Sequence, residues 1–184
     1  KKLNDINIKD IIVVDNLENN FLKKKNLKDI FYSKYYDKYQ FIKLIENNKV
    51  KENINIIFHL GACSSTTNFD KIYMNKNNYE YSKTLLKWCN NNKVPLIYAS
   101  SASVYGSTLE ESKETDEMKP LNPYAESKKK FDEYVLKNVQ NLEIPLVGLR
   151  YFNVYGPNEN HKQNMTSPIY KFNEQLIKVN KINI

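Results

Sequence analysis

The sequence predicts an α/β fold, a Rossmann-type doubly wound parallel sheet, on three observations. Short apolar runs, rich in β-branched and aliphatic side chains, alternate with longer amphipathic stretches. Runs of this kind are typical of strands that are buried on both faces, and strand–helix–strand repetition indicates a parallel sheet with helices on both sides. Each run also ends in small or polar residues, and ligands bind beyond the carboxyl ends of such strands.

The predicted elements follow in chain order. The strands are expected at residues 11–14, 54–59, 96–99 and 146–149. Between them, the spacing of apolar residues predicts helices at residues 38–46, 71–90 and 123–138. Leu85, Leu86 and Trp88 recur at helical spacing in the second of these helices. A further helix is expected close to the end of the chain.

The two ends of the chain predict that the domain is partial. A nucleotide-binding half begins with a strand and a glycine-rich turn, but the four glycines of this chain form no G-x-G-x-x-G. We therefore expect a fragment in which the first strand and the substrate domain are missing. Residues 1–157 are expected to form an N-terminally truncated NAD(P)-binding domain, and residues 158–184 to begin a substrate-binding region.

Composition excludes several classes of protein. The 184 residues hold 28 Lys and Arg against 21 Asp and Glu, a net charge of +7. Arg150 is the single arginine, whereas nucleic-acid surfaces favour clustered arginine. No apolar run is long enough to span a membrane, and the two cysteines have no metal-ligand spacing. We expect a cytoplasmic protein that has no metal site and binds neither membranes nor nucleic acid.

Tyr124 and Lys128 are the first candidates for chemistry. Asn122 can cap a helix and Pro123 suits its first turn, which places Tyr124 and Lys128 four residues apart on one helical face. The pKa of a free tyrosine is about 10, and a nearby ammonium favours the phenolate. A solvated lysine beside a tyrosine is the alternative, because both residue types are abundant in this chain.

Ser100 and Ser101 favour the functional interpretation of Tyr124 and Lys128 over that alternative, because they end a predicted buried strand upstream of the Tyr/Lys helix. Ser101 could hydrogen-bond a substrate alcohol as the alcohol loses its proton. The alternative is that these serines only cap or turn the chain. His59 also ends a predicted strand, and we expect it to be a packed, hydrogen-bonded histidine.

Four segments together resemble the extended short-chain dehydrogenase/reductase superfamily of nucleotide-sugar enzymes, and within it the ADP-glyceromanno-heptose 6-epimerase family. They are residues 14–17, 59–67, 98–106 and 150–157, the last with His161-Lys162 following. The run Gly61-Ala62-Cys63-Ser64-Ser65-Thr66-Thr67 discriminates best, because most relatives carry a different loop there. The resemblance extends over nearly the whole chain.

The resemblance implies epimerisation at C6″ of ADP-D-glycero-β-D-manno-heptose to the L-glycero form, in the route to the lipopolysaccharide inner core. A 6″-ketone would form transiently, and hydride would return to its opposite face. The two proton-exchanging residues of the family match Tyr124 and Lys162. Lys128 would bind the cofactor and tune Tyr124, while Ser101 would steady the hydroxyl. The resemblance further implies NADP, with NAD as the alternative, and a homo-oligomer.

Cofactor and substrate positions are carried over residue by residue. Asp15 would hold the adenosine ribose, and Asn16 and Lys23 would face a 2′-phosphate, although the choice among the lysines at 23–25 stays open. The other implied cofactor positions are Lys38, Leu60, Gly61, Ala62, Cys63, Ser64, Asn77, Lys128, Val154 and Lys162. The implied substrate contacts are Ser101, Asn153, Asn164 and Lys171. Asn164 replaces a small hydroxyl residue of the family, and Lys171 replaces the histidine of some members.

Three alternatives stay open. Within the same class, the chain could belong to a UDP-hexose 4-epimerase, whereas a dehydratase is disfavoured because Ala102-Ser103 stand where dehydratases carry an Asp-Glu pair. The fragment could also be inactive, since it lacks the backbone donors of the glycine-rich turn, and we expect it alone to bind NADP weakly. A basic nucleic-acid-binding module would instead show steep salt dependence.

Overall fold

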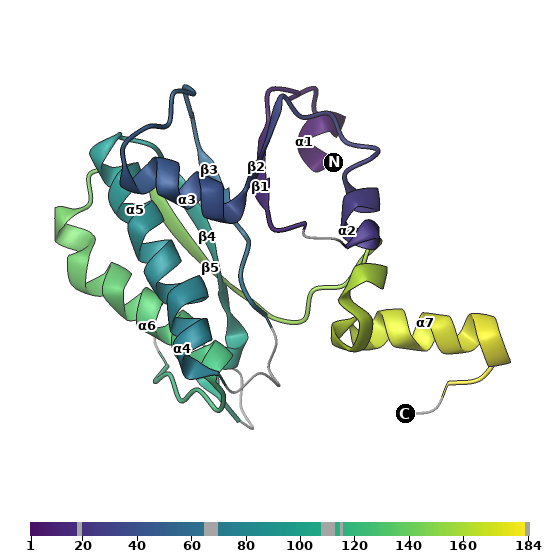
Figure 1. The fold of residues 1–184 in the computed structure, drawn as a ribbon. Helices are drawn as coiled ribbons and strands as arrows, with labels where there is room; N and C mark the ends of the chain where they lie inside the picture. The colour runs from purple at the N-terminus through teal and green to yellow at the C-terminus, as the bar shows by residue number, and fades with distance from the viewer. Residues whose placement is uncertain (18–19, 65–69, 108–112, 115, 183–184) are drawn as a thin grey trace. The chain divides into compact units, whose positions relative to one another are not determined.

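The structure, a computed structural model, describes residues 1–17, 20–64, 70–107, 113–114 and 116–182 (Figure 1). It divides into two compact units. Unit 1 comprises Lys1–Phe41 and Asn153–Ile184, and unit 2 comprises Ile42–Phe152. Within the described residues, no helix has the length and apolar character that a membrane span requires.

Unit 2 is built on a parallel sheet in the order β3-β4-β5. Its strands are β3 (Ile57–His59), β4 (Leu96–Ser101) and β5 (Leu146–Tyr151), with Leu96 opposite both Ile57 and Leu146. Figure 1 shows α5 and α6 running side by side along this sheet. The helical segments are α4 (Lys71–Met74), the π-helix η1 (Asn75–Glu80), α5 (Tyr81–Asn91), η2 (Ala102–Tyr105), α6 (Pro123–Asn138) and η3 (Val139–Asn141).

The core of unit 2 lies between β4 and these helices. Side chains alternate along β4, so that Leu96, Tyr98 and Ser100 are buried while the residues between them are half-buried. The Tyr98 ring meets the Phe131 ring of α6 edge to face, with 4.8 Å between ring centroids. Leu86 and Cys89 of α5 are fully buried, and burial raises the pKa of the Cys89 thiol to about 12. The core therefore fixes α6 against the strand that ends at Ser101.

Unit 1 contains a second pair of parallel strands, β1 (Ile12–Asp15) and β2 (Lys34–Asp37), in register from Ile12 opposite Lys34 to Asp15 opposite Asp37. Helix α3 (Lys38–Glu46) follows β2 directly and continues into unit 2. The other helical segments of unit 1 are α1 (Lys2–Asp5), α2 (Phe21–Asn26), η4 (Asn160–Met165) and α7 (Pro168–Val179).

The predicted parallel α/β fold is confirmed, and most of its elements lie where the sequence placed them. Helices α3 and α6 have the predicted bounds, while β4 and β5 each extend two residues beyond the predicted ends. The predicted strand at residues 54–59 is confined to its last three residues. Strand β2 was not predicted, and the predicted helix 71–90 contains an unpredicted π segment. The expected domain boundary at residue 157 stays a prediction.

Candidate active site

Helix α6 places Tyr124 and Lys128 on one face, for the local reasons that the sequence suggested. The Asn122 side chain accepts a hydrogen bond from the Ala125 N–H at 2.9 Å, and Pro123 occupies the first turn. An N-cap of this kind satisfies a donor that the helix would otherwise leave unpaired. The Lys128 Nζ lies 5.9 Å from the centroid of the Tyr124 ring.

Ser101 meets Tyr124 at the carboxyl end of β4. Its side chain is hydrogen-bonded to the Tyr124 hydroxyl. The same Oγ lies 2.8 Å from the Ser103 Oγ and accepts a hydrogen bond from the Ser103 N–H at 3.2 Å, which caps η2. Ser101 therefore caps the chain, as the structural interpretation predicts, and also contacts the tyrosine; its role toward a substrate alcohol stays a prediction.

Lys128 is buried, with 6% of its surface exposed. Its Nζ donates to the Ala99 carbonyl at 2.6 Å. Burial lowers the pKa of Lys128 to about 8, and the negative charge of Asp132 partly opposes that effect. Since an ammonium carries three protons, the bond to Ala99 leaves two for another acceptor among or beyond the described residues.

The structure differs from the expectation for Tyr124. The sequence predicts that Lys128 lowers the tyrosine pKa, but the pKa of Tyr124 is raised. Burial is the main cause, and the hydrogen bond to Ser101 opposes it only in part. The Lys128 ammonium is itself desolvated and bound to Ala99, so it does not offset the burial of the phenol.

A loop after β3 lies against the same helix through a residue that the sequence did not reveal. Asn78, in the π segment η1, accepts from the Cys63 N–H at 2.8 Å and donates to the Cys63 carbonyl at 3.0 Å. Its Nδ2 also lies 3.0 Å from the Ser127 Oγ, and Ser127 donates to the Tyr124 carbonyl at 2.6 Å. Asn78 thus joins the predicted cofactor loop, residues 60–64, to α6. Its neighbour Asn77 donates to the Tyr73 carbonyl at 3.0 Å.

His59 is a packed histidine, as predicted. Its Nε2 lies 2.7 Å from the Ser82 Oγ, and its ring stacks on Tyr81 at 5.8 Å between centroids. Ser82 gives its hydroxyl proton to the Asn78 carbonyl, so Nε2 carries the ring hydrogen and donates it. Burial, aided by the positive charge of Lys128, lowers the pKa of His59 to about 3. The imidazole is therefore neutral at physiological pH.

In unit 1, three predicted cofactor residues come together at the end of β1. The Asp15 carboxylate is exposed and accepts from the Asn16 N–H at 2.7 Å. The Lys23 Nζ donates to the Asn16 carbonyl at 2.8 Å. This contact ties the Lys23 side chain to the residue that follows Asp15, and the choice among the lysines at 23–25 stays a prediction. Asn16 and Lys23 present the donors, and Asp15 the acceptor, that a ribose phosphate needs.

Lys162 lies in η4 of unit 1 and pairs with a buried carboxylate. The Glu159 side chain, with 3% of its residue surface exposed, accepts from the Gly156 N–H at 2.9 Å and from the Ser167 N–H at 2.8 Å. The Ser167 Oγ donates to it at 2.9 Å, and the Lys162 Nζ lies 3.4 Å away. Burial opposes the charge of Glu159, but these hydrogen bonds outweigh it and lower the pKa to about 2.

The predicted site residues fall in both units of the structure. Ser101, Tyr124 and Lys128 converge in unit 2, where the loop at residues 60–64 also lies. Lys38, Asn153, Val154 and Lys171 belong to unit 1, and the last three are exposed. The side chain of Asn164, together with residues 65–67 of the resembling loop, lies outside the described residues. No cluster that could hold a metal ion occurs among the described residues.

This arrangement can exchange a proton with a small ligand. The Tyr124 hydroxyl contacts Ser101 and lies beside Lys128, whose pKa is lowered to about 8. Groups of this kind can take a proton from a hydroxyl and return it.

Comparisons with known proteins identify the family of the chain. The model of the NAD dependent epimerase/dehydratase family matches residues 1–184. A curated relative from Alkalilimnicola ehrlichii, ADP-L-glycero-D-manno-heptose-6-epimerase, is 47% identical over 167 residues, which cover 91% of this chain and 52% of the relative. The chain therefore spans about half the length of that relative.

Solved structures give a similar result. The crystal structure of Helicobacter pylori ADP-L-glycero-D-manno-heptose-6-epimerase matches with a TM-score of 0.82 at 26% identity, covering 98% of this chain and 58% of that chain. UDP-glucuronic acid 4-epimerase from Bacillus cereus, solved with UDP-glucuronic acid and NAD, matches with a TM-score of 0.74 at 23% identity. That match covers 96% of this chain and 58% of the other, and it supports the fold alone.

Proposed function

This chain belongs to the NAD dependent epimerase/dehydratase family, and we propose from that premise that it carries the redox site of an ADP-heptose 6-epimerase. The proposed reaction inverts C6″ of ADP-D-glycero-β-D-manno-heptose to the L-glycero form. The observation that carries the proposal is the convergence of Ser101, Tyr124 and Lys128 at the carboxyl end of β4. The 47% identity to a heptose epimerase supports the choice of substrate.

The residues divide the work by their chemistry. A bound nicotinamide would supply the hydride acceptor and, after the ketone has turned, the hydride donor. Tyr124 first gives its own phenolic proton to solvent and then, as the phenolate, takes the proton of the C6″ hydroxyl on one face, while Ser101 holds that hydroxyl. Lys162 returns a proton on the opposite face, since inversion needs a proton donor on each side of the carbon. Lys128 holds the cofactor through its two remaining ammonium protons.

A nicotinamide cofactor fits the donors and acceptors of the chain. Asp15, at the end of β1, is an exposed acceptor suited to a ribose diol. Lys23 lies beside Asn16 and would face a 2′-phosphate, which favours NADP over NAD. We further propose that the loop at residues 60–64, held by Asn78, lies along the dinucleotide.

The remaining parts of the proposal concern the whole protein. We propose that it is a cytoplasmic homo-oligomer, and analytical ultracentrifugation measures the oligomeric state. The boundary near residue 157 would separate the cofactor-binding region from the substrate-binding region. Asn153, Asn164 and Lys171 would contact the sugar nucleotide.

A nucleotide-sugar assay tests the proposal. The protein is incubated with NADP and either ADP-D-glycero-β-D-manno-heptose or UDP-glucose, and the products are resolved by NMR. The 184-residue chain is assayed first, and then the whole encoded protein where the gene encodes more. We expect little or no turnover by the 184-residue chain alone and conversion of the ADP-heptose, but not of UDP-glucose, by the whole encoded protein; activity confined to UDP-glucose would reject the substrate assignment.

Two tyrosine variants on one helix test the residue roles. Tyr124→Phe removes the hydroxyl that exchanges the proton and should lower kcat about 100-fold or more. Tyr134→Phe, which changes a tyrosine of α6 packed edge to face against Tyr79, serves as the matched control. Equal activities of the two variants would reject the role of Tyr124.

A further inference from the structure

Asp132 lies one helical turn after Lys128 on α6, where only 4% of its surface is exposed. Its carboxylate accepts from the Ser100 Oγ at 2.9 Å and from the Tyr98 hydroxyl at 3.1 Å. The Arg150 Nε donates to the same carboxylate at 3.1 Å. None of these groups takes part in the chemistry proposed above, so the buried carboxylate needs a separate explanation.

Arg150, on β5, is engaged on every side by other elements. Its Nη1 donates to the Tyr105 hydroxyl at 3.0 Å and to the Glu114 carbonyl at 3.1 Å. The guanidinium also lies 5.1 Å from the centroid of the Tyr105 ring. Burial opposes its charge, but the bonds to Tyr105 and Asp132 outweigh burial and raise the pKa of Arg150.

Stability alone does not explain this buried ion pair. Removing two charges from water costs about as much free energy as their attraction returns, and apolar replacements are often equally stable. A second role is therefore expected, and the surroundings indicate one. Lys128 is bonded to Ala99, and Asp132 is bonded to Ser100, so α6 holds two consecutive residues of β4 immediately before Ser101.

Asp132 also supplies the negative charge that faces Lys128. Around Lys128, His59 of β3 is neutral at physiological pH, and Tyr124 of α6 and Tyr98 of β4 keep their protons because burial raises their pKa. Arg150 of β5 acts through its bond to Asp132. The Asp132 charge opposes the effect of burial on the Lys128 ammonium.

We propose that Asp132 is a positioning residue: it fixes the end of β4 so that Ser101 meets Tyr124, and it holds the counter-charge for the Lys128 ammonium. The proposal rests on the proposed function for its catalytic consequence only. The local effect on Lys128 can be measured without substrate or cofactor.

Three variants separate this role from a purely structural one. Asp132→Asn keeps the shape and removes the charge, but it also leaves Arg150 unpaired. The double variant Asp132→Asn/Arg150→Met removes both charges and relieves that cost. Glu133→Gln, next along α6, is the matched control, because Glu133 lies 3.8 Å from Lys129 and is partly exposed.

The readout is the titration midpoint of Lys128, followed by NMR of ¹³Cε-labelled lysine and assigned with Lys128→Met. We expect the midpoint to fall by about one pH unit in Asp132→Asn, to stay low in the double variant, and to be unchanged in Glu133→Gln. An unchanged midpoint in Asp132→Asn, or recovery of the wild-type midpoint in the double variant, would overturn the proposal.

Kinetics then connect this role to catalysis. In the active protein, the double variant should refold to wild-type stability and lose kcat with an unchanged KM. Recovery of kcat together with stability would show that Asp132 acts only through the fold and would overturn the positioning role. It is also possible to separate the two proposals. If neither the wild type nor any variant turned over ADP-heptose, but the titration midpoint of Lys128 shifted as expected, the proposed function would fail and the role of Asp132 would stand.

Discussion

His59 should make the stability of the protein depend on pH in mild acid. The pKa of its imidazole is about 3 in the folded protein, against about 6.5 in an unfolded chain. As the pH falls below 6.5, the unfolded chain binds a proton that the folded protein excludes, so the free energy of unfolding decreases. Between pH 7.5 and 5.0 the imidazole accounts for 1.5 pH units at 1.36 kcal/mol each, a loss of about 2 kcal/mol.

Urea unfolding at the two pH values measures this loss. His59→Gln is the test variant, because a glutamine amide can still donate to the Ser82 Oγ but does not titrate. We expect the variant to lose about 2 kcal/mol less than the wild type between pH 7.5 and 5.0. His161→Gln, which removes the other imidazole, is the control and should lose as much as the wild type. Equal losses in the wild type and His59→Gln would refute the reasoning.

Two further predictions concern stability. Glu159→Gln places an amide donor against the Ser167 N–H and removes a carboxylate whose pKa is lowered to about 2, so it should cost about 3 kcal/mol at pH 7 in urea unfolding. Glu174→Gln, at an exposed ion pair, should change stability by less than about 0.5 kcal/mol, and a similar loss in both variants would contradict the first prediction. Gly148→Ala should cost about 1–3 kcal/mol, because a Cβ there would overlap the Tyr98 ring. Gly61→Ala, where a Cβ meets nothing within 4 Å, is its control, and an equally small effect at both glycines in thermal unfolding would contradict this explanation.

The fold was predictable wherever a single apolar pattern carried the information. Helix α6 could be placed because Asn122 and Pro123 mark its start and apolar residues repeat at helical spacing. Strand β2, Lys-Tyr-Tyr-Asp, could not, because it is polar at both ends and, among the described residues, pairs with β1 alone. The π segment η1 also left no signal, since its six residues are mostly asparagine and other polar types, and no periodicity marks an added residue per turn.

The candidate site was predictable where its residues follow a spacing or a strand end that can be recognised in the sequence. Tyr124 and Lys128 follow from the i, i+4 rule, and Ser101 follows from the end of a buried strand. Asn78 and Asp132 were missed, because their partners lie on other elements and an asparagine or aspartate in a polar stretch of helix looks like a solvated residue. The direction of the Tyr124 pKa was wrong because spacing reveals a nearby charge but not the burial of the phenol.

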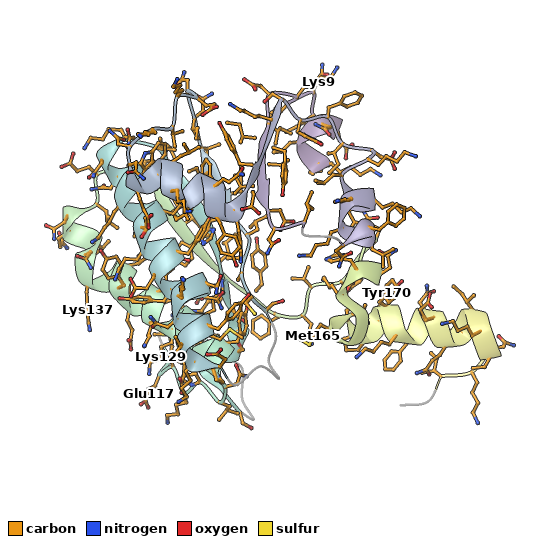
Figure 2. The ribbon with its side chains drawn as sticks, viewed as in Figure 1. Lys9, Glu117, Lys129, Lys137, Met165 and Tyr170 are labelled. Carbon is orange, nitrogen blue, oxygen red and sulfur yellow. The ribbon has the colours of Figure 1, made fainter. Side chains whose placement is uncertain are left out.

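A crystal structure of the protein with bound NADP tests the central claim most directly, with Lys128→Met and Lys137→Met as matched variants. Lys137 projects from the exposed part of α6 (Figure 2). The account predicts that Ser101, Tyr124 and Lys128 line the nicotinamide end of the cofactor in the crystal. In a titration of NADP binding, Lys128→Met should raise the Kd and Lys137→Met should leave it unchanged. A cofactor bound away from all three side chains would contradict it.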